Sequence, residues 1–220
     1  MKNQVSQVHV TIHQSRRGSN SKLDGMSSIN TTPELNPTCE ARRKAGIDHV
    51  CSHCYSKRML GYRYKLAKPY EENYRYLNEH ELTMEEAAAV PIGTLYCRIE
   101  SMGETGSVMH AINYLKIIDT HPLTKFGWWT KNWHFLQIAI EKFGHKPKNL
   151  TIVLSSSIIG NVRDIDTEER LRTEYQADHL FTVYPKDTPD EQINCGGRRC
   201  MDCLKCYRKD TEFHIKERLK

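Results

Sequence analysis

The feature that most constrains this chain is a run of four cysteines within twelve residues, Cys195, Cys200, Cys203 and Cys206. Two thiols separated by two residues on a tight turn can bind one metal group, so the C-x4-C-x2-C-x2-C run offers four soft ligands from one loop. The Gly196-Gly197 pair lets the backbone fold close to such a group. We therefore predict that these four cysteines bind metal.

The crowding of the four thiols bears on which metal they hold. Structural zinc sites usually pair two C-x2-C turns about a dozen residues apart, because a tetrahedral ion needs ligands from two directions. The C-x4-C-x2-C spacing also occurs in loops that hold ferredoxin-type clusters, whose larger core lets one loop reach several corners. We favour an iron–sulfur cluster, of the 4Fe-4S type, and keep zinc as the alternative.

A second and sparser set of cysteines lies near the other end of the chain: Cys39, Cys51 and Cys54, with the spacing C-x11-C-x2-C. A 4Fe-4S cluster held by three thiolates leaves one iron open to a substrate or to S-adenosylmethionine, whereas a purely structural site is normally filled. Seven thiols can serve one cluster or two, and the sequence leaves that number open.

A fourth ligand for the sparse set would come from His53, from Cys97 or from the C-terminal set. His53 lies between Cys51 and Cys54, and these neighbours constrain its side chain, which disfavours it as a ligand. Cys97 lies in the middle of an apolar strand, on the face shared by Leu95 and Ile99, and is better interpreted as a buried thiol.

Length and composition indicate a soluble globular protein. At 220 residues the chain is predicted to form a single domain over residues 1–220, long enough to bury a core. It has no run of eighteen apolar residues and no apolar core of a signal peptide, which predicts a cytoplasmic protein without a membrane partner. A reducing compartment disfavours disulfides and favours metal binding by close cysteines.

The formal charge of +5 overstates the basicity of the chain, because metal-bound cysteines are thiolates that the count leaves out. Nucleic-acid binding is therefore only weakly supported, and the substrate or partner is not identified.

The middle of the chain alternates strands with helices. We predict strands at 94–100, 125–130, 149–154 and 180–184, helices at 107–119, 132–143 and 167–178, and an early strand at 8–13. A helical stretch at 56–78 is expected to break at Pro69, and a short helix starts with the capping box at Thr83. This alternation predicts an α/β fold, either a partial (β/α) barrel or an open parallel sheet, with cysteine-rich segments 39–54 and 195–206.

In either architecture, chemistry takes place at the carboxyl ends of the strands. Three predicted strand ends carry small or polar residues: Glu100 with Gly103-Glu104, Thr130-Lys131-Asn132, and Ser155-Ser156-Ser157. We interpret Asn132 as an ordinary helix cap. For Glu104 the functional and the structural interpretations are equally balanced.

Several of these motifs together resemble the phage gene product 88 family over residues 20–207. The motifs are Asn20-Ser-Lys-Leu, Asn36-Pro-Thr-Cys39, Cys51-Ser-His-Cys54-Tyr55, Tyr96-Cys-Arg-Ile-Glu-Ser-Met-Gly103-Glu104, Trp128-Trp-Thr130-Lys131, Leu150-Thr-Ile-Val-Leu-Ser155-Ser and the cysteine-rich end. The resemblance implies a phage or prophage origin, and hence the host cytoplasm, more than it implies a reaction.

The chain is more distantly similar to radical S-adenosylmethionine proteins. That resemblance implies that Cys39, Cys51 and Cys54 hold a cluster after the first strand of a partial barrel. It also implies that Gly103 and Glu104 bind the amino group of S-adenosylmethionine. The usual spacing of that superfamily is C-x3-C-x2-C, and here the first gap is eleven residues.

Two hypotheses follow from the sequence. The first is an iron–sulfur protein of the radical S-adenosylmethionine type, with a reactive cluster at the sparse set and an auxiliary or structural cluster at the C-terminal set. The second is a non-catalytic protein stabilised by zinc or clusters, which binds nucleic acid or a host protein. The catalytic residues of an enzyme are not identified by the sequence.

Overall fold

The fold is organised around one seven-stranded sheet. The computed structural model describes residues 8–15, 18, 21–160 and 168–219, so Asn20 and Thr167 lie outside the described residues. The strands are ordered as they occur in the sequence, and all neighbours are parallel except the antiparallel pair β1 and β2. They are β1 (Ile12–Gln14), β2 (Ser27–Ile29), β3 (Tyr96–Ile99), β4 (Lys125–Thr130), β5 (Leu150–Ser155), β6 (His179–Tyr184) and β7 (His214–Arg218).

The predicted mixed α/β fold with a mostly parallel sheet is confirmed, but a barrel is not. Within the described residues β1 and β7 are the two edges and do not pair with each other, so the sheet is open. The sequence prediction found five strands and missed β2 and β7. The strand β2 is three residues of a Ser-rich stretch, and β7 alternates apolar with charged residues in a short segment.

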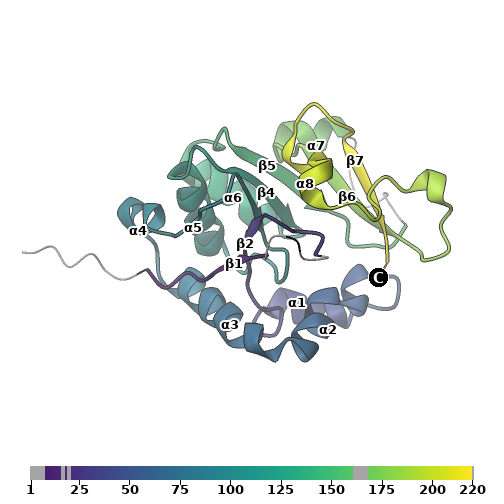
Figure 1. Ribbon diagram of the computed structural model, residues 1–220, viewed down its shortest axis with the longest axis horizontal. Helices are drawn as coiled ribbons and strands as arrows, with labels where there is room; N and C mark the ends of the chain where they lie inside the picture. The colour runs from purple at the N-terminus through teal and green to yellow at the C-terminus, as the bar shows by residue number, and fades with distance from the viewer. Residues whose placement is uncertain (1–7, 16–17, 19–20, 161–167, 220) are drawn as a thin grey trace, which may run out of the picture.

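Eight α-helices occur in the described chain (Figure 1). They are α1 (Pro37–Arg43), α2 (Tyr55–Tyr62), α3 (Tyr64–Glu79), α4 (Met84–Ala88), α5 (Val108–Asp119), α6 (Trp133–Phe143), α7 (Glu168–Glu174) and α8 (Cys200–Cys203). Short 3-10 turns occur at Val50–His53, Asp190–Gln192 and Lys205–Tyr207. In Figure 1 the first three helices form a row along the bottom, and α5 and α6 lie to the upper left of them. α3 contacts α5, because Nδ2 of Asn113 donates to the carbonyl oxygen of Leu77 at 2.9 Å.

The predicted break at Pro69 is wrong. The break falls at Arg63, whose backbone leaves the helical region with φ −110° and ψ 54°, and Pro69 lies inside α3. Proline lacks an N–H, so it removes its own hydrogen bond from the helix, yet the apolar face of α3 still buries Tyr70 and Leu77 against the rest of the protein. Tertiary packing therefore outweighs the local cost of the proline.

The two faces of the sheet are covered differently. Side chains alternate across a strand, so Cys97 and Ile99 of β3 enter the main core with α5 and α6, together with Trp128 of β4. The buried position of Cys97, with no exposed surface, matches its predicted apolar role. The opposite face carries Trp129, which packs with Tyr207 of the cysteine-rich end.

The edges of the open sheet approach each other although no strands join them. The Nζ atom of Lys22, in the connection from β1 to β2, lies 2.5 Å from the Glu217 carboxylate in β7. The backbone N–H of Cys200 donates to the carbonyl oxygen of Lys22 at 2.8 Å. The sheet is thus curved, and the cysteine-rich end spans the gap between its edges.

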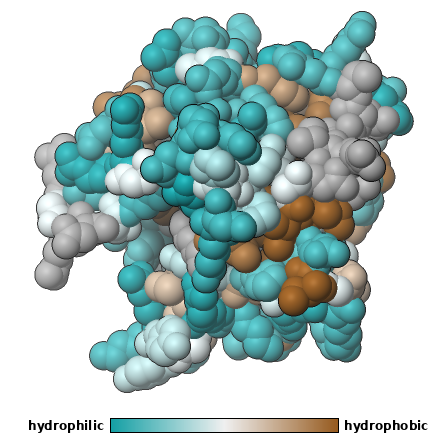
Figure 2. All heavy atoms as spheres, turned by 90° about the vertical axis from the view of Figure 1, so that its right-hand side faces the viewer, coloured by the Kyte–Doolittle hydropathy of each residue, from teal (hydrophilic) through white to brown (hydrophobic). Residues whose placement is uncertain are grey.

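The side of the molecule that carries β6 and β7 is mostly hydrophilic, with apolar residues gathered in one small patch (Figure 2). Among the described helices, none combines the length and the apolar character needed to cross a membrane.

Candidate metal centre

The three cysteines of the sparse set are held by local turns and helix starts. The side chain of Asn36 caps α1 by accepting from the Thr38 N–H at 3.0 Å, and Pro37 opens the helix that carries the buried Cys39. Cys51 lies in a 3-10 turn, where its N–H donates to Nδ1 of His49 at 3.1 Å. The sulfur of Cys54 caps α2 by accepting from the Lys57 N–H at 3.4 Å.

These three thiols line one cavity of about 830 Å³ at the carboxyl edge of the parallel strands. Burial raises the pKa of the Cys39 and Cys51 thiols above their ordinary value. Lys131 opposes that rise at both cysteines, and Arg42 opposes it at Cys51. The protein thus places two cations beside thiols that burial alone would keep protonated.

The predicted Gly103-Glu104 turn lies at the same cavity. The Glu104 carboxylate is buried and accepts from the N–H groups of Thr105 and Lys131, at 3.0 and 2.9 Å, and from the Thr130 hydroxyl at 2.5 Å. Its backbone carbonyl accepts from Nδ2 of Asn36 at 2.9 Å, which ties this turn to the helix that carries Cys39. Glu104 thus joins the ends of β3 and β4 next to the thiols.

Gly103 has a backbone conformation that other residues rarely adopt, with φ +92°. A Cβ atom there would lie 2.3 Å from Oγ1 of Thr31 and 2.6 Å from Oε2 of Glu100. Only glycine fits this close approach between the turn and the strand beside it.

Glu100, the other carboxylate at this strand end, belongs to the core and not to the cavity. It is buried with φ +56°, and it accepts from the Thr31 hydroxyl at 2.8 Å and the Tyr114 hydroxyl at 2.9 Å. Burial raises the pKa of Glu100 to about 8, and the hydrogen bonds from Thr31 and Tyr114 only partly offset that rise. Its neighbour His110, whose Nε2 lies 3.7 Å away, has a pKa lowered by burial to about 3.

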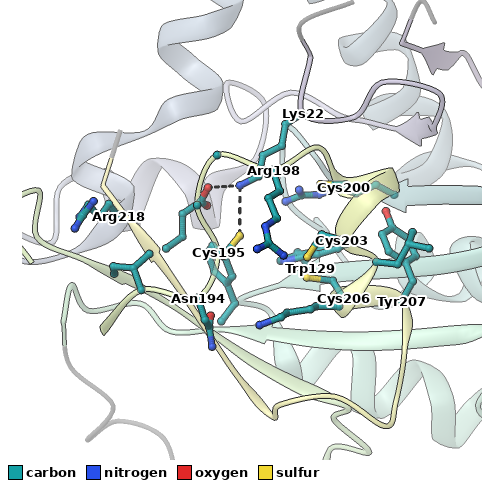
Figure 3. A pocket seen from close by; sticks show the side chains of 18 of the residues that line it. Lys22, Trp129, Asn194, Cys195, Arg198, Cys200, Cys203, Cys206, Tyr207 and Arg218 are labelled. Atoms are coloured by element: carbon teal, nitrogen blue, oxygen red, sulfur yellow. Dashed lines mark hydrogen bonds and ion pairs between the residues drawn. The ribbon is translucent and has the colours of Figure 1, made fainter. Parts of the chain in front are cut away.

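The four C-terminal cysteines line a second cavity, of about 580 Å³, against the face of the sheet that carries Trp129 of β4 and Phe181 of β6. Cys200 and Cys203 belong to α8, which Leu204 ends in the left-handed conformation with φ 52°, and Cys206 follows in a 3-10 turn. In Figure 3 the sulfurs of Cys203 and Cys206 lie beside Trp129. One short segment therefore presents all four predicted thiols to one cavity.

Positively charged side chains also lie beside the C-terminal cysteines. The Lys22 Nζ lies 3.4 Å from the Cys195 sulfur, drawn as a dashed line in Figure 3. Burial alone would lower the pKa of Lys22, but Glu217 and Cys195 raise it well above its ordinary value, so the side chain stays charged. Burial raises the pKa of the Cys200 thiol, and Arg98 and Lys22 oppose that rise.

The described side chains do not converge on a single metal ion. Within the described ranges, no three or more His, Cys, Asp or Glu side chains are arranged around a single ion. All eight cysteines are free, and the C-terminal cavity also contains the buried hydroxyl of Tyr207, for which the described residues provide no hydrogen-bond partner. The described side chains therefore do not form a preorganised site for a single ion.

The two single-residue alternatives for a fourth ligand are placed differently. His53 lines the same cavity as the three thiols, with its Nε2 3.0 Å from the carbonyl oxygen of Ile47. Cys97 lies in the main core on the far side of β3. Asn132 is the cap residue of α6 by position, but its side chain makes no capping bond and instead donates to Oγ1 of Thr38 at 3.2 Å.

Of the cations beside the thiols, Lys131 lies at a predicted strand end, whereas Arg98, Lys22 and Arg42 were not identified as site residues by the sequence prediction. Arg98 alternates with Cys97 along β3, so its position on the opposite face was readable from the strand period. Lys22 lies in the loop between β1 and β2, and Arg42 lies on the short helix α1. No spacing or periodicity in the sequence marks either of them as a neighbour of the thiols. Ser157, predicted at a strand end, accepts from the Val50 N–H at 2.8 Å and so connects β5 to the turn of Cys51.

These features define an α/β protein with a mostly parallel, open sheet and two cysteine sets in adjoining cavities. The sequence matches the gene product 88 family over residues 10–213, and the chain belongs to this family. A search of curated proteins and a search of solved structures each found no match. The predicted phage family is thereby confirmed, whereas no comparison supports the more distant resemblance to radical S-adenosylmethionine proteins.

Proposed function

We propose that this chain is an iron–sulfur protein with an open cluster site at Cys39, Cys51 and Cys54 and a filled, stabilising cluster at Cys195, Cys200, Cys203 and Cys206. The open site is proposed to bind S-adenosylmethionine beside Gly103 and Glu104. The substrate would enter from the cavity that these residues share.

One observation carries this proposal: three thiols and the Gly-Glu turn line the same cavity, at the strand edge where parallel α/β folds place their sites. The turn and the first thiol are also coupled directly, through the hydrogen bond from Asn36 to the Glu104 carbonyl. A cluster with S-adenosylmethionine supplies radical chemistry that protein side chains do not provide.

The residues of the chain would bind and orient the S-adenosylmethionine. Gly103 lets the turn pass close to Thr31 and Glu100, and Glu104 uses three of about four carboxylate acceptor positions within the protein. The remaining position can accept from an ammonium group. Lys131 and Arg42 favour the thiolate forms that metal binding requires.

A second function is favoured by the same hydrogen bonds. Because Glu104 already receives three donors from the protein, its role can be wholly structural. The chain would then be a non-catalytic protein stabilised by zinc or clusters, with nucleic acid or a host protein as its partner.

The test is the iron, sulfide and zinc content of protein purified without oxygen. We expect iron and sulfide with visible absorbance, a partial loss of iron in Cys54→Ser, and no loss in Cys97→Ala, which removes a thiol outside both cavities. Reduced protein with S-adenosylmethionine is then assayed for 5′-deoxyadenosine. A colourless protein with stoichiometric zinc would contradict the proposal, and an intact cluster without that product would favour the second function.

A further inference from the structure

The two cavities share a wall. Five residues line both of them: Lys22, Arg98, Phe181, Glu217 and Arg218. The thiol sets therefore lie at the two ends of one continuous depression, and this common wall lies between them. Together the two volumes are in the range that small-molecule sites occupy, roughly 300–1,000 Å³ each.

The three cations of the common wall differ in whether they have an ion-pair partner. Lys22 is paired with Glu217, and the Arg218 guanidinium is paired with Asp190 at 2.6 Å. The Cζ atom of Arg98 lies over the Trp129 ring, 4.0 Å from its centroid. Its Nε atom is buried, and the described residues offer it no hydrogen-bond partner.

The cavity around the sparse set is also strongly basic. Its lining has more cations than carboxylates and cysteines together: Lys22, Arg42, Arg63, Arg98, Lys131 and Arg218 against Glu104, Glu217 and the three thiols. A second guanidinium atom, Nη1 of Arg42, is likewise buried without a partner in the described chain. Leaving such donors unsatisfied is costly, so each calls for a bound acceptor.

We propose that Arg98 binds the phosphate or carboxylate group of a small anionic ligand that lies between the two thiol sets. The planar guanidinium matches these groups by paired hydrogen bonds, and the ring of Trp129 holds it in place. The inference needs only the polypeptide and its cavity, so it goes beyond the proposed cluster chemistry and does not depend on it.

The experiment is calorimetric titration of the full chain, purified without oxygen, with three probes: 2′-deoxyadenosine 5′-monophosphate, malonate and the neutral 2′-deoxyadenosine. We expect an anionic probe to bind and the neutral nucleoside to bind at least tenfold more weakly. The stronger of the two anions distinguishes phosphate from carboxylate. Equal binding of the nucleoside and its monophosphate would overturn the proposal.

The variant Arg98→Met keeps an unbranched apolar side chain beside Trp129 and removes the guanidinium group. We expect its affinity for the anionic probe to fall at least tenfold. The matched control is Arg172→Met, because Arg172 also lies over an aromatic ring, 4.3 Å from the Phe213 centroid, but outside both cavities. Equal affinities of the two variants would contradict the inference. If Arg98→Met does not fold, Arg98→Lys keeps the positive charge without the paired donors of the guanidinium. It is expected to bind the anionic probe about tenfold more weakly than the wild type.

Two further readouts separate this site from the proposed cluster site. Arg98→Met should retain the iron content of the wild type, and loss of iron with unchanged anion binding would assign Arg98 to a cluster instead. The monophosphate should still bind in the presence of saturating S-adenosylmethionine, whereas mutual exclusion would assign Arg98 to the carboxylate of that cofactor. A chain without iron that binds the anion would refute the proposed function and support this inference.

Discussion

The two thiol sets are built in opposite ways. The C-terminal set comes from one segment that packs against the sheet through Tyr207 and Trp129. The sparse set is assembled from α1, a 3-10 turn and the start of α2, and its cavity is bounded by the ends of several strands. The first arrangement ties the chain end to the sheet, and the second leaves space beside the thiols.

We propose that this difference separates a stabilising role of the C-terminal set from a binding role of the sparse set. Ligands from one short segment that bridges the sheet edges couple metal binding to the fold, because losing the metal releases the segment. Ligands at strand ends beside a large cavity can lose a metal while the sheet remains intact. The comparison predicts that equivalent substitutions in the two sets have unequal effects on stability.

The largest expected effect comes from Cys200→Ser. We expect it to remove metal from the C-terminal set and to lower the free energy of unfolding by about 3–5 kcal/mol, since a metal that ties the sheet edges is lost. Cys54→Ser is the matched variant and should lose metal from the sparse set at a cost of about 1 kcal/mol. Anaerobic denaturant unfolding with metal analysis measures both, and equal destabilisation would refute the division of roles.

The next effect concerns the turn beside the sparse set. Gly103→Ala should destabilise the protein by about 3 kcal/mol, because the new Cβ meets Thr31 and Glu100 in a conformation that alanine disfavours. Gly144→Ala is the control, with nearly the same φ of +91° but no atom within 4 Å of its Cβ, and should cost about 1 kcal/mol. Thermal unfolding of both variants compares crowding with backbone strain alone.

A smaller effect concerns the pH dependence of stability and comes from Glu100, at the same edge of the sheet. The pKa of Glu100 rises from 4.5 in the unfolded chain to about 8 in the fold, so its contribution to stability is complete below about pH 4.5. As pH rises from there to 8, the unfolded chain releases this proton first, and stability falls by up to about 1.4 kcal/mol per pH unit.

Glu100→Gln stays neutral at every pH, so the free energy of unfolding measured between pH 5 and 8 should depend less on pH than in the wild type. Glu79→Gln, on the exposed face of α3, serves as the control. If the two variants show the same pH profile, Glu100 does not carry this dependence.

The smallest effect tests the link between the sheet edges. Lys22→Met should cost about 1–2 kcal/mol, because it removes the 2.5 Å ion pair between Lys22 and the half-buried Glu217 carboxylate. It should also weaken metal retention at Cys195 more than at the sparse set. Lys44→Met, which removes an exposed pair with Glu40, should change neither quantity. Chelator challenge followed by metal analysis gives the result.

Local signals in the sequence located the elements that depend on short-range chemistry. The capping box at Thr83 and Glu86 is present, and Gly144 ends α6 in the left-handed conformation. Strand β4 has the predicted bounds at Lys125–Thr130. These features depend on hydrogen bonds and dihedral preferences of neighbouring residues, so the sequence alone reveals them.

Features that depend on distant partners were not accessible in the same way. The strand β2 exists because Ser27 and Ile29 pair with Cys97 and Ile99 of β3, seventy residues later, and its own composition predicts a loop. The predicted cysteines do line two cavities, but the shared wall of Arg98 and Lys22 arises only when β3 and the first loop meet β7. Register and curvature, which bring these residues together, are not encoded in local spacing.

The contact between Lys22 and Glu217 also bears on the order in which the protein matures. It joins residues 195 positions apart, and β7, which supplies Glu217, is the last strand to be synthesised. A nascent chain that lacks β7 has six of the seven strands and all four C-terminal cysteines, but not the contact between the sheet edges. The approach of the two edges can therefore be completed only after β7 has been synthesised, when the strands of the core already exist.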